Sequence, residues 1–337
     1  MKYTTLGKTG LKVSVVGLGG IPVQNSDAEN CRKVIDACEE VGINFIDTAR
    51  GYTVSEEYIG AALEGRRDKF VLATKTMVRD YEGMKAEIET SLKMLRTDYI
   101  DLYQLHLMKT DLEFDTVFGE NGAYKALVEA REAGKIGHIG ASAHDVKAFK
   151  RLITEFGDKM ETVMFPFNIV ETQGLELMRE CTEKNIAVIA MKPMAGGNLP
   201  DATLAMKFIL NNPDCTIAIP GMGDPKEVYE NVAAIDAGEL TGEDKAACAK
   251  IVAELGNQFC RRCGYCAPCP QGIVIPSCFL FSNYLRNYGL GEWAKGRYWS
   301  MKATAVDCIK CGACETRCPY ELPIRDMLER VAKEFER

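Results

Sequence analysis

The stretch that decides the fold spans residues 42–52 and reads Gly-Ile-Asn-Phe-Ile-Asp-Thr-Ala-Arg-Gly-Tyr. Its short apolar run, Ile43–Ile46, is typical of a buried strand and ends at the polar residue Asp47. A segment with helical spacing follows. The same unit, an apolar run and then a helical pattern, recurs through the first two-thirds of the chain.

Eight apolar runs are predicted to be strands. They are Val15–Leu18, Ile43–Ile46, Phe70–Thr74, Ile100–Leu105, Ile136–Gly140, Thr162–Phe165, Ala187–Ala190 and Thr216–Ile219. Strands that alternate with helices pair in parallel. Eight such units in about 250 residues favour a closed (β/α)8 TIM barrel over an open sheet. The segment 3–13, with glycines at its turn, predicts a hairpin that plugs the bottom of this barrel.

Composition narrows the class of protein. The chain has 337 residues, 47% of them hydrophobic, and a formal net charge of −7. This charge argues against nucleic acid or an anionic membrane as the main partner. The first residues carry no apolar signal segment, and no apolar run reaches the length of a bilayer span. We therefore expect a cytoplasmic protein whose scattered cysteines are buried thiols.

The sequence pattern changes near residue 256, where the regular alternation of apolar runs and helical segments stops. Two cysteine runs follow, Cys260–Pro270 and Cys308–Pro319. The second run is C-x2-C-x2-C-x3-C-P, the bacterial ferredoxin pattern, and the first is one residue shorter before its last cysteine. These features predict a barrel over residues 1–255 and a small, mostly helical, ferredoxin-like two-cluster domain over residues 256–337, packed on the barrel.

The runs predict two 4Fe–4S clusters. In two-cluster ferredoxins the fourth cysteine of each run binds the other cluster. One predicted ligand set is therefore Cys260, Cys263, Cys266 and Cys318. The other is Cys308, Cys311, Cys314 and Cys269. Zinc is the alternative, because two C-x2-C pairs can bind it tetrahedrally.

Four polar side chains follow or end adjacent predicted strands. Asp47 ends the second strand and Tyr52 follows it, Lys75 ends the third, and His106 ends the fourth. Barrel enzymes place their reactive groups at these strand ends. An ammonium beside a phenol favours the phenolate, so this set suits proton donation to a carbonyl oxygen. Taken singly, each residue has a structural reading, such as a helix cap, a rim charge or a core histidine.

At these residues the chain resembles the aldo-keto reductase family over about residues 1–255. Its catalytic tetrad matches Asp47, Tyr52, Lys75 and His106 in type, order and barrel position. The resemblance implies a nicotinamide cofactor across the barrel mouth and Tyr52 as the general acid. The cysteine tail resembles a branch of the family that carries a ferredoxin-like C-terminal extension.

The resemblance also implies contacts to the nicotinamide. Ser142 matches the serine of the family's Ser-Asn pair, and Ala143 replaces the asparagine. Met164 stands where the family has a glutamine, and Met191 stands where it has a stacking tyrosine. The pocket has therefore lost polar contacts, although a thioether can still cover a ring.

The loop after the eighth strand is the place where the family binds the adenosine phosphates. Besides Gly20, the residues implied to contact the dinucleotide are Gly221, Gly223, Glu227, Glu230 and Asn231. NADP-preferring members carry a lysine and an arginine where this chain has Gly221 and Glu227. A carboxylate repels a 2′-phosphate and can accept from a ribose hydroxyl, so the sequence favours NAD(H) over NADP(H).

Together these features predict an oxidoreductase that reduces an aldehyde or ketone with a nicotinamide cofactor. The alternative is an iron–sulfur electron-transfer or redox-sensing protein whose barrel binds nucleotide without fast carbonyl turnover. Nicotinamide delivers two electrons as hydride, whereas a cubane passes one at a time, and no flavin site is visible between them. Three roles for the clusters therefore stay open: they stabilise a tail that lines the substrate pocket, they sense oxidation, or they accept electrons from a ferredoxin or flavoprotein. The sequence does not specify the substrate or the oligomeric state.

Overall fold

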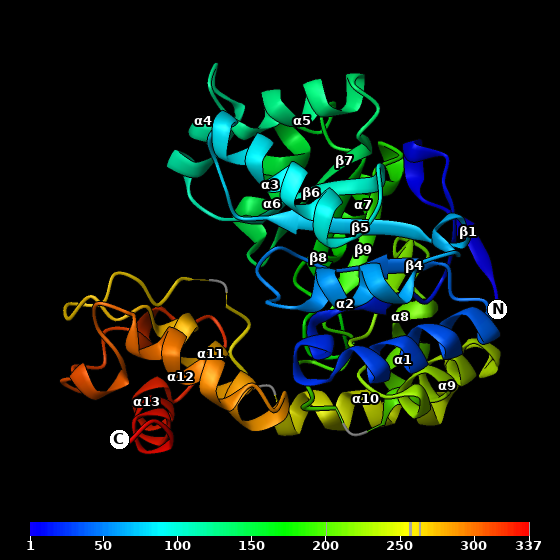
Figure 1. Cartoon of the computed structure of the whole chain (residues 1–337). Coiled ribbons are helices and arrows are strands. Elements are labelled where there is room, and N and C mark those ends of the chain that lie inside the picture. Colours follow the sequence, from blue (N-terminus) through cyan, green and yellow to red (C-terminus); the bar gives the residue numbers. More distant parts are fainter. Residues whose placement is uncertain (200, 256–257, 263, 337) are drawn as a thin grey trace. The chain divides into compact units, whose positions relative to one another are not determined.

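The computed structural model describes residues 1–199, 201–255, 258–262 and 264–336 (Figure 1). The chain folds as two compact units. The first unit is Met1–Asn168, Thr172–Pro193 and Asp201–Leu240. The second unit is Ile169–Glu171, Met194–Pro200 and Thr241–Arg337. The second unit therefore contains two short segments from the barrel half of the sequence as well as the cysteine-rich tail.

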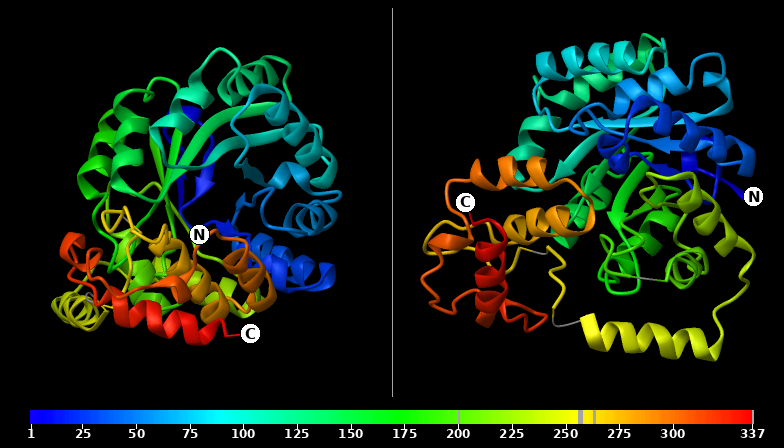
Figure 2. Two further views of the ribbon diagram at one scale, coloured as in Figure 1. Left: turned by 90° about the vertical axis from the view of Figure 1, so that its left-hand side faces the viewer. Right: turned by 60° about the horizontal axis from the view of Figure 1, so that its bottom comes forward.

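An eight-stranded parallel sheet forms the centre of the first unit (Figure 2). Its strands are β3 (Leu18–Gly19), β4 (Phe45–Asp47), β5 (Val71–Thr76), β6 (Ile100–Met108), β7 (Ile136–Ala143), β8 (Thr162–Pro166), β9 (Ala187–Met191) and β10 (Ile217–Ile219). They pair in chain order, and parallel bridges from Val16 to Ala218 and from Gly19 to Gly221 join the first strand to the last. The predicted barrel is confirmed.

The first barrel strand differs from its predicted range. β3 covers Leu18–Gly19 rather than Val15–Leu18. The amide of Val15 donates to Lys2 O at 3.0 Å, whereas the amide of Gly17 donates to Ala218 O at 2.8 Å. Because this segment divides its hydrogen bonds between the N-terminal residues and β10, it forms a continuous ladder only from Leu18 onward.

Helices follow the strands and cover the outside of the barrel (Figures 1 and 2). In the first unit they are α1 (Ala28–Val41), α2 (Ser55–Ala62), α3 (Tyr81–Met94), α4 (Asp111–Phe118), α5 (Ala123–Glu132), α6 (Val146–Thr154), α7 (Leu175–Glu183), α8 (Ala202–Leu210) and α9 (Pro225–Ala233). Short 3-10 helices are η1 (Gly7–Thr9), η2 (Ile21–Asn25), η3 (Arg67–Lys69) and η4 (Ala234–Asp236).

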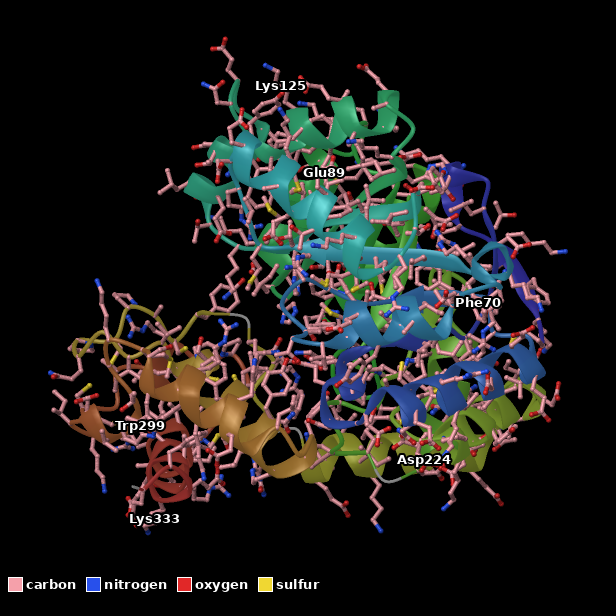
Figure 3. All side chains as sticks on the ribbon, viewed as in Figure 1. Phe70, Glu89, Lys125, Asp224, Trp299 and Lys333 are labelled. Atoms are coloured by element: carbon pink, nitrogen blue, oxygen red, sulfur yellow. The ribbon has the colours of Figure 1, made fainter. Side chains whose placement is uncertain are left out.

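The barrel helices show clear start signals and exposed polar faces. Five begin after an aspartate whose carboxylate accepts from an amide of the first turn: Asp27, Asp80, Asp145, Asp201 and Asp224. Such caps satisfy amides that have no partner within the helix. Outward-facing side chains include Glu89 on α3 and Lys125 on α5 (Figure 3).

The predicted N-terminal hairpin forms from β1 (Tyr3–Thr5) and β2 (Lys12–Ser14), which pair antiparallel. It contributes Leu6 and Val13, both fully buried, to the barrel core beside Phe45 and Ile217. The amide of Lys8 donates to Asn185 O at 2.9 Å, just before β9 begins. The hairpin therefore covers the N-terminal ends of the strands and leaves the opposite mouth for the site.

The second unit is helical, as expected. It contains α10 (Gly242–Leu255), α11 (Ile275–Asn287), α12 (Gly291–Trp299) and α13 (Ile324–Glu334), with 3-10 helices η5 (Ala305–Asp307) and η6 (Glu315–Arg317). The apolar stripe of α13 is buried, and Phe335, just after it, stacks on Tyr298 with ring centroids 4.0 Å apart. The sequence assigns α10 to the barrel, whereas the compact units separate at Leu240.

Candidate functional site

The four tetrad candidates gather at the C-terminal ends of three adjacent strands. Asp47 ends β4, Lys75 lies on β5 and His106 lies on β6, while Tyr52 follows β4. The Lys75 Nζ donates to Asp47 Oδ2, and also to Thr48 O at 2.8 Å. Because the Asp47 side chain is only 4% exposed and that of Lys75 only 2%, this ion pair is held inside the protein.

The phenol of Tyr52 lies near both this pair and the imidazole. The Lys75 Nζ is 4.9 Å from the centroid of the Tyr52 ring. The Tyr52 and His106 rings meet edge to face, with centroids 6.0 Å apart and an interplanar angle of 88°. A fixed ammonium this close to a phenol stabilises negative charge on its oxygen. The arrangement therefore brings a phenol, a buried ammonium and an imidazole to one place.

Burial and neighbouring charges set the protonation of the site. Burial raises the pKa of Asp47, and the attraction of Lys75 opposes that change. Burial likewise lowers the pKa of Lys75, which Asp47 opposes. The pKa of His106 lies well below its usual value because of burial and then the positive charges of Lys75, Arg79 and Lys109. A neutral imidazole can donate one hydrogen bond to a carbonyl without competing as an acid.

Two polar residues that the sequence analysis did not single out hold the site. Gln104, on β6, donates from Nε2 to Asp47 Oδ1 at 3.0 Å. Arg79 donates from Nη2 to His106 O at 2.8 Å and to Leu107 O at 3.0 Å, where Leu107 has a φ of 59°. Gln104 could have been found from its position two residues before His106, because alternate residues of a strand share a face.

A buried carboxylate network lies beside the tetrad. Glu56, 1% exposed, accepts from Thr74 Oγ1 at 2.7 Å and from Ser91 Oγ at 2.8 Å. Its other oxygen pairs with Arg50 Nη1 at 2.6 Å. Arg50 belongs to the motif between Asp47 and Tyr52, so the network fixes the turn that delivers the phenol. A lone glutamate in a helix gives no sequence signal for this role.

The residues expected at the nicotinamide lie on neighbouring strands. Ser142 on β7 pairs in register with Met164 on β8, and Met191 ends β9. Ser142 Oγ accepts from the Leu107 amide at 2.8 Å and keeps its own hydroxyl hydrogen to donate. Met164 and Met191 belong to the barrel core and are 1% and 9% exposed. These side chains offer an apolar wall with one hydroxyl donor.

The residues expected at the dinucleotide are distributed over the loop after β10 and the start of α9. The carboxylate of Glu227 accepts from the amides of Gly223 and Asp224, at 2.6 and 3.2 Å, in a capping box. Both amides donate to Oε2, so the bonds of the capping box engage one oxygen of this carboxylate. Glu230 pairs with Lys226 at 3.4 Å on the exposed face of α9.

Two further contacts bear on dinucleotide binding. Asn231, 5% exposed, donates from Nδ2 to Glu227 O at 2.7 Å, while its Oδ1 is buried and has no hydrogen-bond partner among the described residues. A base with an amino group would satisfy that acceptor. Gly20 lies against Asp47, where an added Cβ would come within 2.8 Å of Asp47 O. Gly221 approaches Pro22 in the same way, at 3.0 Å.

One set of predicted cluster ligands lines a single hollow in the second unit. The lining includes Cys269, Cys308, Cys311 and Cys314, with Ile275 and Leu328 among the apolar residues around them. The described cysteines are all free of disulfides. Within the described ranges, no three His, Cys, Asp or Glu side chains gather closely enough for a single metal ion. Four thiols around an apolar hollow are the donor set of a cubane.

The other predicted ligand set is described in part. Cys260 and Cys318 are partly buried and Cys266 is buried, whereas Cys263 lies outside the described residues. Arg317, next to Cys318, donates from Nη2 to Cys266 O at 2.9 Å and to Pro268 O at 2.8 Å. One guanidinium thus joins the two cysteine runs.

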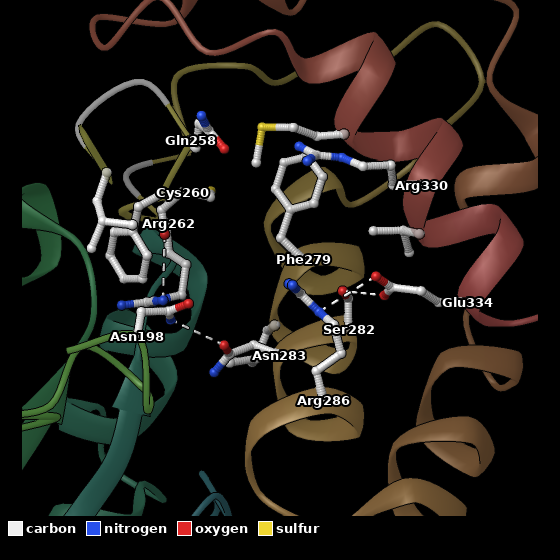
Figure 4. Close-up of a pocket in the computed structure, with 15 residues that line it drawn as sticks. Asn198, Gln258, Cys260, Arg262, Phe279, Ser282, Asn283, Arg286, Arg330 and Glu334 are labelled. Atoms are coloured by element: carbon white, nitrogen blue, oxygen red, sulfur yellow. Dashed lines mark hydrogen bonds and ion pairs between the residues drawn. The ribbon is translucent and has the colours of Figure 1, made fainter. Parts of the chain in front are cut away.

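A pocket of the second unit lies beside Cys260 (Figure 4). Helices α11 and α13 supply most of its walls, with Phe279, Ser282 and Arg286 from the first and Arg330 and Glu334 from the second. Ser282 Oγ donates to Glu334 Oε2 at 2.5 Å, and Arg286 lies 3.4 Å from the same carboxylate. Ser282 and Arg286 thus already bind the Glu334 carboxylate, one of the charged groups in this pocket.

No helix in the described part of the chain is long and apolar enough to cross a membrane.

Comparisons with known proteins agree with both parts of this description, the barrel and the cysteine-rich tail. The model of the "4Fe-4S dicluster domain" matches residues 259–323. This match places iron–sulfur clusters in the cysteine-rich tail.

Relatives and solved structures match the barrel. An uncharacterized oxidoreductase of Bacillus subtilis, YqkF, is 26% identical over 72% of this chain and 94% of its own length. An NADH-specific methylglyoxal reductase of Escherichia coli is 27% identical over 70% of this chain and 94% of its own. The holo form of aldo-keto reductase AKR11C1 from Bacillus halodurans aligns with a TM-score of 0.64 and 26% identity, covering 74% of this chain and 96% of that one. The model of the "Aldo/keto reductase family" matches residues 15–203, and the chain belongs to that family of oxidoreductases.

Proposed function

We propose that the protein reduces a small-molecule aldehyde or ketone with a nicotinamide cofactor, and that Tyr52 donates the proton. The observation that carries this proposal is the buried ammonium of Lys75, bonded to Asp47 and 4.9 Å from the Tyr52 ring. Family members act on small-molecule carbonyls, which is the chemistry that such an acid serves.

The chain's own residues have separate roles in this reaction. Lys75, fixed by Asp47 and Thr48 O, stabilises the negative charge that Tyr52 carries after it gives up its proton. Neutral His106 donates to the carbonyl oxygen and orients it toward the phenol. A bound reduced nicotinamide supplies hydride to the carbonyl carbon.

The cofactor-facing residues fit a dinucleotide. Ser142 retains a hydroxyl hydrogen for a carboxamide, and Asn231 Oδ1, which has no partner among the described residues, suits an adenine amino group. We infer a preference for NAD(H), because Glu227 stands where a basic residue would meet a 2′-phosphate. The NADH-specific methylglyoxal reductase among the relatives supports this preference. Clearly tighter binding of NADPH than of NADH would contradict it.

We infer two 4Fe–4S clusters with crossed fourth ligands, and a reducing, cytoplasmic setting for their thiols. A second candidate function, one-electron exchange with a ferredoxin or flavoprotein, is favoured by one observation: Cys311 of the second ligand set is exposed. Anaerobic mixing with NADH separates the two functions. Bleaching of the cluster absorbance when a ferredoxin or flavoprotein carrier is added, without carbonyl-dependent NADH oxidation, would favour electron transfer; carbonyl-dependent NADH oxidation with unchanged clusters would favour the reductase.

The direct test of the reductase is Tyr52→Phe. Loss of a positioned general acid lowers the rate about 10²- to 10⁴-fold. We expect the variant to bind NADH normally and to lose carbonyl reduction by about that factor. Near-normal turnover would overturn the assignment of Tyr52.

A further inference from the structure

Two arginines of the first cysteine run bind the loop that follows β8. Arg261 donates from Nε to Val170 O at 2.8 Å, and Arg262 pairs through Nη2 with Glu171 Oε1. The Glu171 side chain is fully buried and that of Arg262 is 11% exposed. All four residues belong to the second unit, although Val170 and Glu171 lie 91 residues before their partners.

These contacts depend on the backbone conformation of the cysteine run itself. Arg262 lies between Cys260 and Cys263, two predicted ligands of the first cluster, and has a φ of 59°. Its Nη1 also reaches Cys260 O at 3.4 Å. A strained residue keeps its conformation only where its surroundings fix it. Ligation of the cysteines on both sides would do so and would hold the guanidinium toward Glu171.

The loop after β9 is held in the second unit as well. Asn283 and Asn287, on α11, both donate from Nδ2 to Gly196 O at 3.1 Å. Asn198 donates to Asn283 Oδ1 at 3.2 Å (Figure 4). Gly196 has a φ of 69°, and an added Cβ would lie 2.5 Å from Asn283 Nδ2, so only glycine allows this approach.

These loops follow the strand ends where barrel enzymes bind their ligands. β8 carries Met164 and β9 ends at Met191, two of the residues expected at the nicotinamide. Within the first unit, Asn168 donates from Nδ2 to Lys192 O at 3.0 Å. This bond joins the two loops just after the ends of β8 and β9. A change at Glu171 therefore has a short covalent path to the cofactor wall.

We propose that Arg262, assisted by Arg261, is a positioning residue that couples assembly of the first cluster to the conformation of the loop after β8, and thereby to nucleotide binding. The coupling rests on the proposed function, because it assigns the nucleotide to the strand ends. In this role the first cluster affects nucleotide binding by the barrel without any transfer of electrons between them.

The test uses anaerobically purified holo-protein and the variants Arg262→Gln, Arg262→Lys, Glu171→Gln and the double variant Arg262→Gln/Glu171→Gln. Arg286→Gln is the matched control, because it also loses an ion pair of the second unit but does not touch residues 169–171. The readouts are the Kd for NADH, hydrogen exchange of a peptide covering residues 167–174, and iron content. A wild-type sample stripped of its clusters with a chelator completes the set.

We expect Arg262→Gln to weaken NADH binding about tenfold, a normal size for coupling between sites, and to raise exchange in residues 167–174. Glu171→Gln should act alike, the double variant should be no worse than either single one, and Arg262→Lys should restore part of the affinity. Cluster-free wild type should show the same loss of protection.

The proposal is overturned if Arg262→Gln matches Arg286→Gln in NADH affinity and exchange, or if the cluster-free protein keeps its protection over residues 167–174. The exchange measurement does not depend on turnover. If the protein binds no NADH at all, the proposed function fails, while altered exchange still reports whether the cluster positions the loop.

Discussion

Gln104 Nε2 donates to Asp47 Oδ1 at 3.0 Å, on the opposite oxygen from the one that Lys75 holds. The carboxylate is thus fixed from two neighbouring strands. Without the amide, Asp47 could rotate about its side chain and carry the ammonium away from Tyr52. Gln104 therefore helps to fix the position of the Lys75 charge through Asp47.

Replacing Gln104 with leucine should reduce both stability and turnover. The change leaves Asp47 Oδ1 buried without that partner, and an unsatisfied buried acceptor costs about 1–3 kcal/mol. Urea unfolding followed by far-UV circular dichroism measures the loss, with Glu132→Leu, an exposed position of the first unit, as the control. An unchanged unfolding midpoint together with unchanged turnover would show that the amide contributes nothing.

The Asp47–Lys75 pair should show strong non-additivity. Lys75→Met and Asp47→Asn each leave a buried charge without its partner, and breaking a buried ion pair in this way costs about 3–5 kcal/mol of stability. The double variant removes both charges, so its destabilisation should be well below the sum of the two single changes. Its carbonyl reduction should remain as low as that of Lys75→Met, because the ammonium beside Tyr52 is absent in both.

The exposed pair of Lys69 and Glu39 provides the comparison for that experiment. Lys69→Met should change the unfolding midpoint little, since solvent screens exposed ion pairs. Additive losses for Asp47→Asn and Lys75→Met would instead mean that the two groups do not depend on each other, and would remove the basis for Asp47 as the partner that keeps Lys75 charged.

The barrel and its strand-end residues could be predicted from the sequence because both follow from local patterns. Apolar runs alternate with helices, and Asp47, Lys75 and His106 stand where such runs end. Gln104 lies within reach of the same pattern, because it stands two residues before His106 on one strand. Glu56 has no such signal, because a polar residue inside a helix is ordinarily on an exposed face. Only the packed structure shows that both are buried.

The assignment of residues to units has the same physical origin. The sequence divides the chain once, near residue 256, where its texture changes. The structure instead includes Ile169–Glu171 and Met194–Pro200 in the second unit. The Arg262–Glu171 pair spans 91 residues, and neither periodicity nor motif spacing carries information about a contact at that range.

The pH dependence of stability should reflect a histidine that stays neutral in the folded protein. Burial, and then Lys75, Arg79 and Lys109, place the pKa of His106 well below the usual 6.5. The folded state therefore binds fewer protons than the unfolded state between the two pKa values. Stability from this group is complete above about pH 6.5 and decreases as the pH falls toward the folded pKa.

The chain has three histidines, so NMR of ¹³C-labelled imidazoles can follow His106 directly, with His106→Asn to assign its signal. We expect its titration to lie well below pH 6.5. Arg79→Gln should move its titration to higher pH, because one of the positive charges that oppose protonation is gone. A normal titration near pH 6.5 would contradict the neutral role proposed for this imidazole.

The cysteine assignment makes the sharpest chemical prediction. Cys311, which lines the hollow with Cys269, Cys308 and Cys314, should be a cluster ligand, whereas Cys278, fully buried in α11, should be an ordinary thiol whose pKa burial raises to about 12. Cys311→Ser should therefore lower iron and acid-labile sulfide by about half and reduce the broad absorbance of the clusters, since one of two cubanes loses a ligand. Cys278→Ala should leave both quantities unchanged. Equal iron loss in the two variants would indicate a general collapse of the second unit, and zinc in place of iron in the anaerobically purified protein would restore the tetrahedral alternative.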